Sequence, residues 1–255
     1  MDIQHYTQKN EKIGDLCLYA GKIMLESGAE TYRVEDTMVR IASSYGIKIS
    51  ESYVTPTAIL FSIEGASLTK TKMKRINKRT TNLNKIARVN SISREISKGN
   101  VSIEEAFQLL KDVEKSTFTY SNWVQVIFAA IASACFVIMF KGSFYDFMPA
   151  LLSGGIGYAS FLLMDRFTNV RFISEFTASF MIAIVALLSV HFGFGIESDK
   201  IIIGSVMPLV PGLLITNAIR DLLAGHLVSG LAKGVEALIT AFAIGSGVAV
   251  VFLFF

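Results

Sequence analysis

VMPLVPGLLITNAIRD, residues 206–221, decides the fold because it lies in a strongly apolar part of the chain but cannot form one continuous helix. Pro208 and Pro211 each remove a backbone donor and clash with the preceding helical turn. In hydrocarbon, backbone groups freed in this way need partners from the protein or from water in a cavity. Asn217 and Asp221 follow the break. A broken membrane helix with polar groups beside it is typical of a transport site.

Charged residues are concentrated in the first part of the 255-residue chain. Residues 1–121 hold 18 of the 24 lysines and arginines and 14 of the 21 acidic residues, which leaves 6 and 7 for residues 122–255. The two parts therefore carry net charges of +4 and −1. Because 52% of all residues are hydrophobic, the chain is too apolar for an average soluble domain. We predict a cytosolic α+β domain at 1–121 and a transmembrane helical domain at 122–255.

Five apolar segments of the second part each approach the roughly 20 residues that a bilayer crossing requires. They are residues 122–140, 144–164, 172–192, 201–219 and 229–253. The chain is thus expected to be a polytopic α-helical membrane protein. The polar start lacks the apolar stretch of a signal peptide, and the lysines and arginines of the first part and of alternate loops predict a cytoplasmic N-terminus. The fourth segment is either a broken span or a re-entrant one, and this choice decides on which side the C-terminus lies.

The first part shows helical and strand-like patterns in turn. Apolar spacing predicts two helices separated near Ser27 and Gly28, followed by a β-branched region with two strands around Pro56. Ser102 and Glu105 form a capping-box pattern at the start of a later helix. The expected elements are helices within 12–45, strands within 47–64 and at 70–76, and helices at 82–97 and 102–114.

A basic run without any acidic residue lies between Gly65 and Arg88. Its members are Lys70, Lys72, Lys74, Arg75, Lys78, Arg79, Lys85 and Arg88. Such a run can attract anionic lipid headgroups, or it can be an ordinary solvated cytosolic face. Stacking aromatic residues are missing from it. We therefore expect no nucleic-acid partner.

The sequence gives no sign of enzymatic chemistry. The three histidines (His5, His191 and His226) lack the spacing of metal ligands, and the two cysteines have no metal-type spacing either. Residues 154–157 are glycine-rich, but they lie in an apolar segment without the lysine of a phosphate loop. We expect no catalytic residue, metal or cofactor.

Ionisable residues near the fourth and fifth segments are the candidates for a translocation path, because a charge at the bilayer centre costs about 3 kcal/mol. Lys233 and Glu236 can share one helix face. Arg220 and Asp221 are adjacent and point apart, so each needs another partner. The predicted translocation residues are Pro208, Pro211, Gly212, Asn217, Asp221 and Glu236. An interfacial turn with ordinary charges is the alternative.

A transport mechanism follows from the break. The exposed start of a half-helix favours a substrate carboxylate, and Asn217 can bind a polar group of a small organic substrate. Asp221 or Glu236 can take up a proton, which would couple export to the proton gradient.

Four motifs together resemble the threonine/serine exporter family, over about residues 13–251. They are SGAETYRVEDTM (27–38), VTPTAILFSI (54–63), RTTNLNKIARVNSISREI (79–96) and PLVPGLLITNAIRDLLAGHLVSGLAKGVEAL (208–238). The resemblance implies a cytosolic N-terminal domain, membrane helices in the cell membrane, and export of threonine or serine driven by protons. Within the first motif, Glu30, Arg33 and Glu35 match the family. They would serve in gating or in a cytosolic vestibule, or they would form local ion pairs at a helix start.

The resemblance also has implications for partners and substrate. Longer family members carry a second set of spans, so this chain looks like the short form that works with a separate small membrane protein; a homo-oligomer also remains open. A related two-component branch is associated with succinate, which makes a dicarboxylate the alternative substrate. A membrane-anchored regulatory or binding module is the further alternative.

Overall fold

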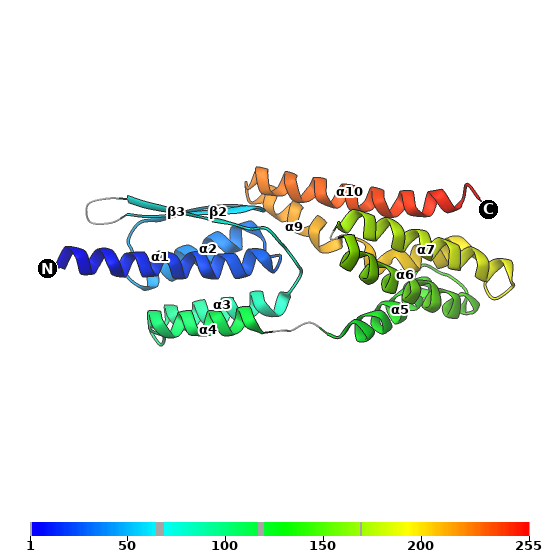
Figure 1. Cartoon of the computed structure of the whole chain (residues 1–255), viewed down its shortest axis with the longest axis horizontal. Coiled ribbons are helices and arrows are strands. Elements are labelled where there is room, and N and C mark those ends of the chain that lie inside the picture. The colour runs from blue at the N-terminus through cyan, green and yellow to red at the C-terminus, as the bar shows by residue number, and fades with distance from the viewer. Residues whose placement is uncertain (1, 65–68, 117–119, 169, 255) are drawn as a thin grey trace. The chain divides into compact units, whose positions relative to one another are not determined.

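The computed structural model describes residues 2–64, 69–116, 120–168 and 170–254 (Figure 1), with side chains from residue 8 onward. Three short stretches that bear on the predictions lie outside the described residues. They are Gly65 at the border of the basic run, residues 117–119 near the end of the predicted first domain, and Asn169 between the second and third apolar segments. The chain forms two compact units. One consists of Met1–Thr119 and Thr216–Gly234, and the other of Tyr120–Ile215 and Val235–Phe255. The functional division at residue 121 stays a prediction.

The first unit begins with two helices, α1 (Asp2–Glu26) and α2 (Thr31–Ser44). The predicted interruption at Ser27 and Gly28 is confirmed. Gly28 has φ +85°, and its amide donates to Leu25 O while Ala29 N donates to Met24 O. A residue in the left-handed region is the usual end of a helix, and glycine adopts that conformation without steric cost. The turn therefore directs α2 back along α1.

A three-stranded antiparallel sheet covers the α1–α2 pair. Its strands are β1 (Ser50–Thr55), β2 (Ala58–Glu64) and β3 (Thr69–Arg75), in the order β1-β2-β3, so all three expected strands are confirmed. Burial alternates along β2, where Ile59, Phe61 and Ile63 enter the core. Such alternation is typical of a sheet with one buried face. Nearly all of β3 is exposed and lysine-rich, which discourages pairing of this edge with another chain.

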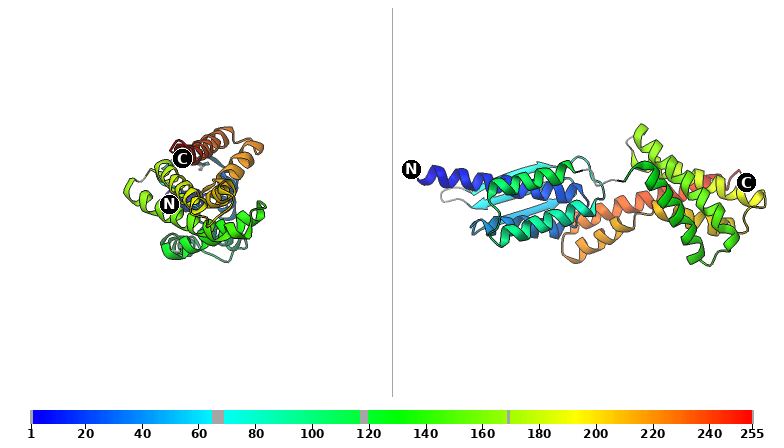
Figure 2. Two further views of the ribbon diagram at one scale, coloured as in Figure 1. Left: turned by 90° about the vertical axis from the view of Figure 1, so that its right-hand side faces the viewer. Right: turned by 90° about the horizontal axis from the view of Figure 1, so that it is seen from below.

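Two further helices, α3 (Leu83–Ser97) and α4 (Ile103–Lys115), pack on the other side of the α1–α2 pair. Figure 1 shows the resulting three layers of sheet, α1–α2 and α3–α4, and in the right-hand view of Figure 2 helices α3 and α4 lie in front of the sheet. The capping box predicted at Ser102 and Glu105 is present at the start of α4. The α+β class of this part of the chain follows from these layers.

The second unit is helical and contains α5 (Asn122–Met139), η1 (Phe144–Asp146), α6 (Phe147–Thr168), α7 (Arg171–His191), α8 (Ser198–Val206) and most of α10 (Leu227–Val251). Helix α6 packs between α5 and α7. Gly154 meets Ser133, and Gly157 meets Ile182, so closely that an added Cβ would overlap the neighbour. Small residues permit this approach between membrane helices.

The predicted break in the fourth segment is confirmed. Helix α8 ends at Val206, a short 3₁₀ turn η2 (Met207–Leu209) follows, and α9 (Gly212–Leu223) begins after Pro211. The segments on the two sides of the break are bent by 60°. Val210 is extended, with φ −60° and ψ 130°, as the residue before a proline prefers. The helical residues run beyond the expected limits of 201 and 219, and both the broken-span and the re-entrant interpretation stay open.

Asp146 is a fully buried acidic residue in the second unit with a structural role. One carboxylate oxygen accepts hydrogen bonds from Ile196 N (2.6 Å) and Glu197 N (3.3 Å), and the other accepts from Ser143 N (3.3 Å). The carboxylate thus caps η1 and holds the loop before α8. Three backbone donors offset the cost of burying its charge.

Candidate functional site

A tight helical hairpin brings Asp221 and Lys233 together. Helix α9 ends at Leu223, Gly225 just beyond it has φ +86°, and His226 N donates to Asp221 O at 2.8 Å. Gly230, in the first turn of α10, lies so close to α9 that a Cβ there would be 2.9 Å from Ala218 O. The two helices of the hairpin are therefore in direct contact, and Lys233 Nζ lies 2.7 Å from Asp221 Oδ2.

Asp221 also binds the start of α2. Thr31 N donates to Oδ1 at 2.9 Å, and Thr31 Oγ1 donates to Oδ2 at 2.9 Å. Thr31 is the first residue of α2, whose N-cap residue Glu30 makes no side-chain capping bond. The carboxylate of Asp221 thus supplies the cap from 190 residues away and meets the positive end of the helix dipole. Asp221 is 0% and Lys233 4% exposed.

Polar contacts extend on both sides of this pair. Asn217 Nδ2 donates to Gly28 O at 3.0 Å. Arg220 donates to Glu30 Oε1 at 2.6 Å, and Arg33 donates to Glu30 Oε2 at 3.2 Å. Burial opposes the charge of Glu30, but hydrogen bonds from its own backbone amide and from the two arginines outweigh burial and hold its pKa below the usual value.

We call this network the Asp221 cluster. Its members are Gly28, Glu30, Thr31, Arg33, Asn217, Arg220, Asp221 and Lys233. The expectation that Arg220 and Asp221 need separate partners is confirmed, since one binds Glu30 and the other binds Lys233 and Thr31. With three basic and two acidic side chains, the cluster carries a formal charge of +1.

Glu35 lies one helical turn further along α2, at the edge of the cluster. Its Oε1 accepts a hydrogen bond from Val54 N (2.8 Å), and its Oε2 lies 3.8 Å from His226 Nε2. Ser229 Oγ donates to Val54 O at 3.0 Å, which joins the same strand to α10. Burial raises the pKa of Glu35, against the effects of the Val54 amide and of His226.

The structure places the predicted site residues in two groups. Glu30, Arg33, Asn217 and Asp221 share the Asp221 cluster, with Glu35 at its edge. Pro208, Pro211 and Gly212 form the bend, and Glu236 follows on α10; these four belong to the second unit. Sequence reasoning missed Thr31 and Ser229. A hydroxyl residue at a helix start was the available signal for Thr31, but no local pattern shows which distant residue it binds.

The cluster contains fixed charges and hydroxyl groups but no activated nucleophile. Within the described ranges, no three His, Cys, Asp or Glu side chains are grouped as metal ligands. The Cys17 thiol is buried in the core of the first unit, and burial raises its pKa far above the usual value. The arrangement can exchange ion-pair partners and hydrogen bonds, which is the chemistry of recognition and gating.

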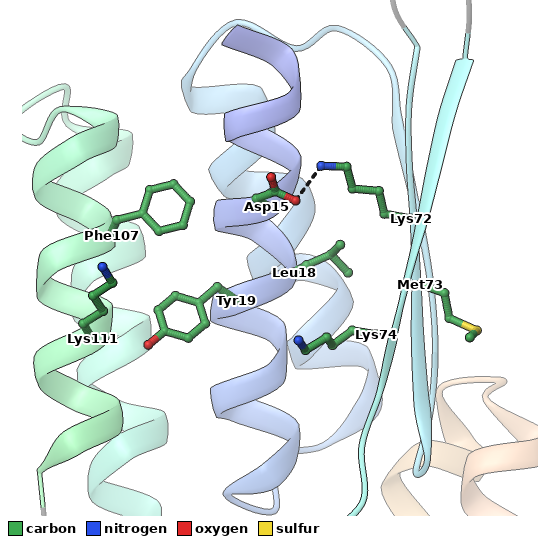
Figure 3. A pocket seen from close by; sticks show the side chains of 8 residues that line it. All are labelled: Asp15, Leu18, Tyr19, Lys72, Met73, Lys74, Phe107 and Lys111. Atoms are coloured by element: carbon green, nitrogen blue, oxygen red, sulfur yellow. Dashed lines mark hydrogen bonds and ion pairs between the residues drawn. The ribbon is translucent and has the colours of Figure 1, made fainter. Parts of the chain in front are cut away.

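A separate surface pocket lies against α1 (Figure 3), with a volume of about 650 Å³. Side chains from α1, β3 and α4 line it, namely Asp15, Leu18, Tyr19, Lys72, Met73, Lys74, Phe107 and Lys111. Lys72 donates to Asp15 at 2.5 Å, and Lys70 pairs with Glu11. Part of the basic run thus neutralises acidic residues of α1. None of the predicted site residues lines this pocket, so the Asp221 cluster is the stronger candidate.

The apolar helices define the class of protein. In the part of the chain that the structure describes, four helical segments are long and apolar enough to cross a membrane, and the bent α8–α9 pair is the fifth candidate. The chain is therefore a multi-pass membrane protein.

Comparison with known proteins narrows the class. Residues 15–255 match the model of a family described as "Putative threonine/serine exporter", and the chain belongs to this family of membrane transporters. It is 26% identical to the "Probable succinate transporter subunit YjjP" of Klebsiella aerogenes, over 86% of this chain and 84% of the relative. It is 25% identical to the "Threonine/serine exporter" of Corynebacterium glutamicum (92% and 49%) and 20% identical to the "Probable threonine/serine exporter" of Mycobacterium tuberculosis (89% and 43%). The chain thus spans less than half of these two exporters. No solved structure matches.

Proposed function

We propose that this chain is one subunit of a secondary transporter in the cell membrane that exports threonine, serine or a similar small amino acid, driven by protons. Residues 1–121 form its cytosolic domain, and the N-terminus is cytoplasmic. The Asp221 cluster serves as the cytosolic gate, and the bend at Pro208, Pro211 and Gly212 lies on the translocation path.

The observation that carries this proposal is the buried Asp221–Lys233 ion pair, together with its contacts to the start of α2. A buried ion pair is a poor source of stability, since removing two charges from water costs about as much as their attraction returns. Such a pair is better suited to a contact that opens and closes. Opening would free an acidic group, a basic group and the amide of a helix N-terminus at one place.

These three groups suit a small amino acid. A zwitterion carries an ammonium group that Asp221 can bind and a carboxylate that Lys233 and the N-terminus of α2 can bind. Substrate would then replace the internal ion pair without leaving either charge unpaired. Asn217, which binds Gly28 O, adds a polar group for a side-chain hydroxyl.

A dicarboxylate such as succinate is the second candidate. The formal charge of +1 of the Asp221 cluster favours an anionic substrate, and the chain matches the succinate transporter subunit over most of both lengths. Arg220 and Arg33, which share Glu30 in the structure, are available for a second carboxylate. The two candidates differ in which group should matter most: Asp221 for a zwitterion, and the arginines for a dicarboxylate.

A second membrane protein completes the proposed transporter. The chain spans 43% and 49% of two exporters of the family, and another relative is named as a subunit. A separate small membrane protein would contribute further spans to the transporter, and self-association of this chain is the other route.

The test is efflux of threonine, serine and succinate from cells that produce this chain with and without a candidate small membrane partner. We expect efflux of one substrate class with the pair and little with either chain alone. Asp221→Asn should abolish amino-acid efflux while the protein still reaches the membrane; Asp36→Asn, on the exposed face of α2, is the matched control. If no combination exports either class, the transporter assignment of this chain is wrong and a membrane-anchored binding module takes its place.

A further inference from the structure

Glu175 is a buried acidic residue on α7 that the proposed gate does not use. Its side chain is 1% exposed. Arg171, one turn earlier, donates from Nε to Glu175 Oε1 at 2.8 Å, and the Arg171 side chain is 49% exposed. The other oxygen, Oε2, has no hydrogen-bond partner among the described residues. One half of the carboxylate is therefore satisfied and the other is not.

A second unsatisfied atom lies beside the first. Thr240 on α10 is fully buried, and its Oγ1 also lacks a hydrogen-bond partner within the described ranges. The hydroxyl is close enough to the Glu175 carboxylate to interact with it, and Glu236, one turn earlier on α10, interacts with Glu175 through its charge. Gly247 lies so close to Ser179 and Phe176 that an added Cβ would overlap them, so α7 and α10 are held together.

Protonation would remove the incompletely satisfied charge of Glu175. An ionised carboxylate can only accept hydrogen bonds, and an unpaired oxygen buried in an apolar environment is unfavourable. A proton on Oε2 removes the charge and turns that atom into a donor, while the Thr240 hydroxyl can accept from the protonated form or donate to the ionised form. Arg171 can stay on Oε1 in both states and serves as the counterion when the proton leaves. The half-exposed position of Arg171 at the start of α7 gives the carboxylate a connection to the surface.

We propose that Glu175 is the residue that binds the coupling proton of the transporter, with Thr240 and Arg171 as its positioning residues. In each cycle Oε2 takes one proton from one side of the membrane and releases it to the other, so only the O–H bond forms and breaks. This inference rests on the proposed export function. The coupling proton is thereby assigned to Glu175 and not to Asp221 or Glu236. Asp221 already accepts hydrogen bonds from three donors.

The first experiment measures protonation without measuring transport. The purified full-length chain in lipid bilayers is titrated with acid and base while infrared difference spectra follow the C=O band of protonated carboxyl groups. We expect a titrating band in the wild type that is missing in Glu175→Gln and unchanged in Glu197→Gln, a variant of an acidic residue paired with Lys200. Thr240→Val should move the midpoint of this band and Thr240→Ser should not. Identical spectra for Glu175→Gln and the wild type would overturn the proposal.

The second experiment separates coupling from transport in vesicles that contain the chain and its partner. Glu175→Gln resembles the protonated side chain in size and charge, so we expect substrate exchange at equal pH to persist while net efflux driven by a pH gradient falls at least tenfold. Loss of both activities, or efflux that follows a sodium gradient instead, would overturn the role of Glu175. If the wild type transports neither substrate class, the export function fails, and the infrared titration alone decides whether Glu175 binds a proton.

Discussion

Asp221 and Glu175 are both buried acidic residues with a basic neighbour, but their surroundings differ. Asp221 accepts hydrogen bonds from Lys233 and from two groups of Thr31, so both oxygens are satisfied. Glu175 has one donor, Arg171, and one oxygen without a partner in the described part of the chain. The number of donors, rather than burial, separates a carboxylate whose two oxygens are both satisfied from one with an oxygen left to gain a proton.

The largest expected effect tests Asp221, the carboxylate whose two oxygens both accept hydrogen bonds. Lys233→Met removes one partner of the buried pair and leaves the Asp221 carboxylate buried without its basic partner, which should lower the free energy of unfolding by about 3–5 kcal/mol. Thermal unfolding of the detergent-solubilised protein measures this loss. The double variant Asp221→Asn with Lys233→Met removes both charges, so it should be more stable than Lys233→Met alone. Equal stabilities of the single and double variants would show that the pair is not coupled.

The next effect compares Glu175 with Asp146, the other buried acidic residue of the second unit. Asp146→Ala removes the acceptor of three backbone amides and should cost about 2–3 kcal/mol, because the amides remain buried without partners. Glu175→Gln relieves an unsatisfied charge and should leave the unfolding temperature equal to or above that of the wild type. A loss of stability in Glu175→Gln as large as in Asp146→Ala would remove the distinction between the two residues.

Much of the fold could be predicted from local patterns. The break at Pro208 and Pro211, the strand region around Pro56 and the capping box at Ser102 each depend on residues that are neighbours along the chain. Their signals are steric or involve hydrogen bonds within one turn. Such features do not require knowledge of which distant segments meet.

The candidate site was only partly predictable, since its decisive contacts join residues about 190 positions apart. Asn217 and Asp221 could be predicted as site residues because polar residues are costly in an apolar segment. No local sequence pattern, however, indicates that Asp221 caps α2. In the sequence, Glu175 is simply an acidic residue near one end of the apolar segment 172–192. Its unsatisfied oxygen depends on α10, and only the packed structure reveals it.

Thr31 offers a smaller test of the satisfied carboxylate. Thr31→Val removes the hydroxyl donor to Asp221 Oδ2 but keeps the backbone donor and the shape of the side chain. We expect a loss of about 1.5 kcal/mol, the low end for a hydrogen bond to a charged group. Thr31→Ser should restore most of this stability in the same thermal unfolding assay. Thr37→Val, which removes a 3.3 Å bond to Asn90 on the same helix, is the control and should cost less.

Glu35 should give the smallest effect on stability. Its hydrogen bonding is intermediate between that of Asp221 and that of Glu175, because it has one amide donor and a histidine 3.8 Å away. Burial raises its pKa, so the folded state holds this proton more firmly than the unfolded state. The resulting stability is present in acid, below the unfolded pKa, and is lost as the pH rises through the folded pKa. Glu35→Gln removes this dependence.

The measurement is the difference in unfolding temperature between the wild type and Glu35→Gln from acidic to neutral pH. The wild type should lose stability relative to the variant as the pH rises. Glu105→Gln serves as the control with the opposite sign, because hydrogen bonds from the backbone and side chain of Ser102 lower the pKa of Glu105. Its contribution is present above the unfolded pKa and is lost as the pH falls through the folded value. Parallel curves of unfolding temperature against pH for the wild type and Glu35→Gln would contradict this prediction. They would mean that burial with a single amide donor does not make a carboxylate in this protein retain its proton. The argument for Glu175 would then depend on Thr240.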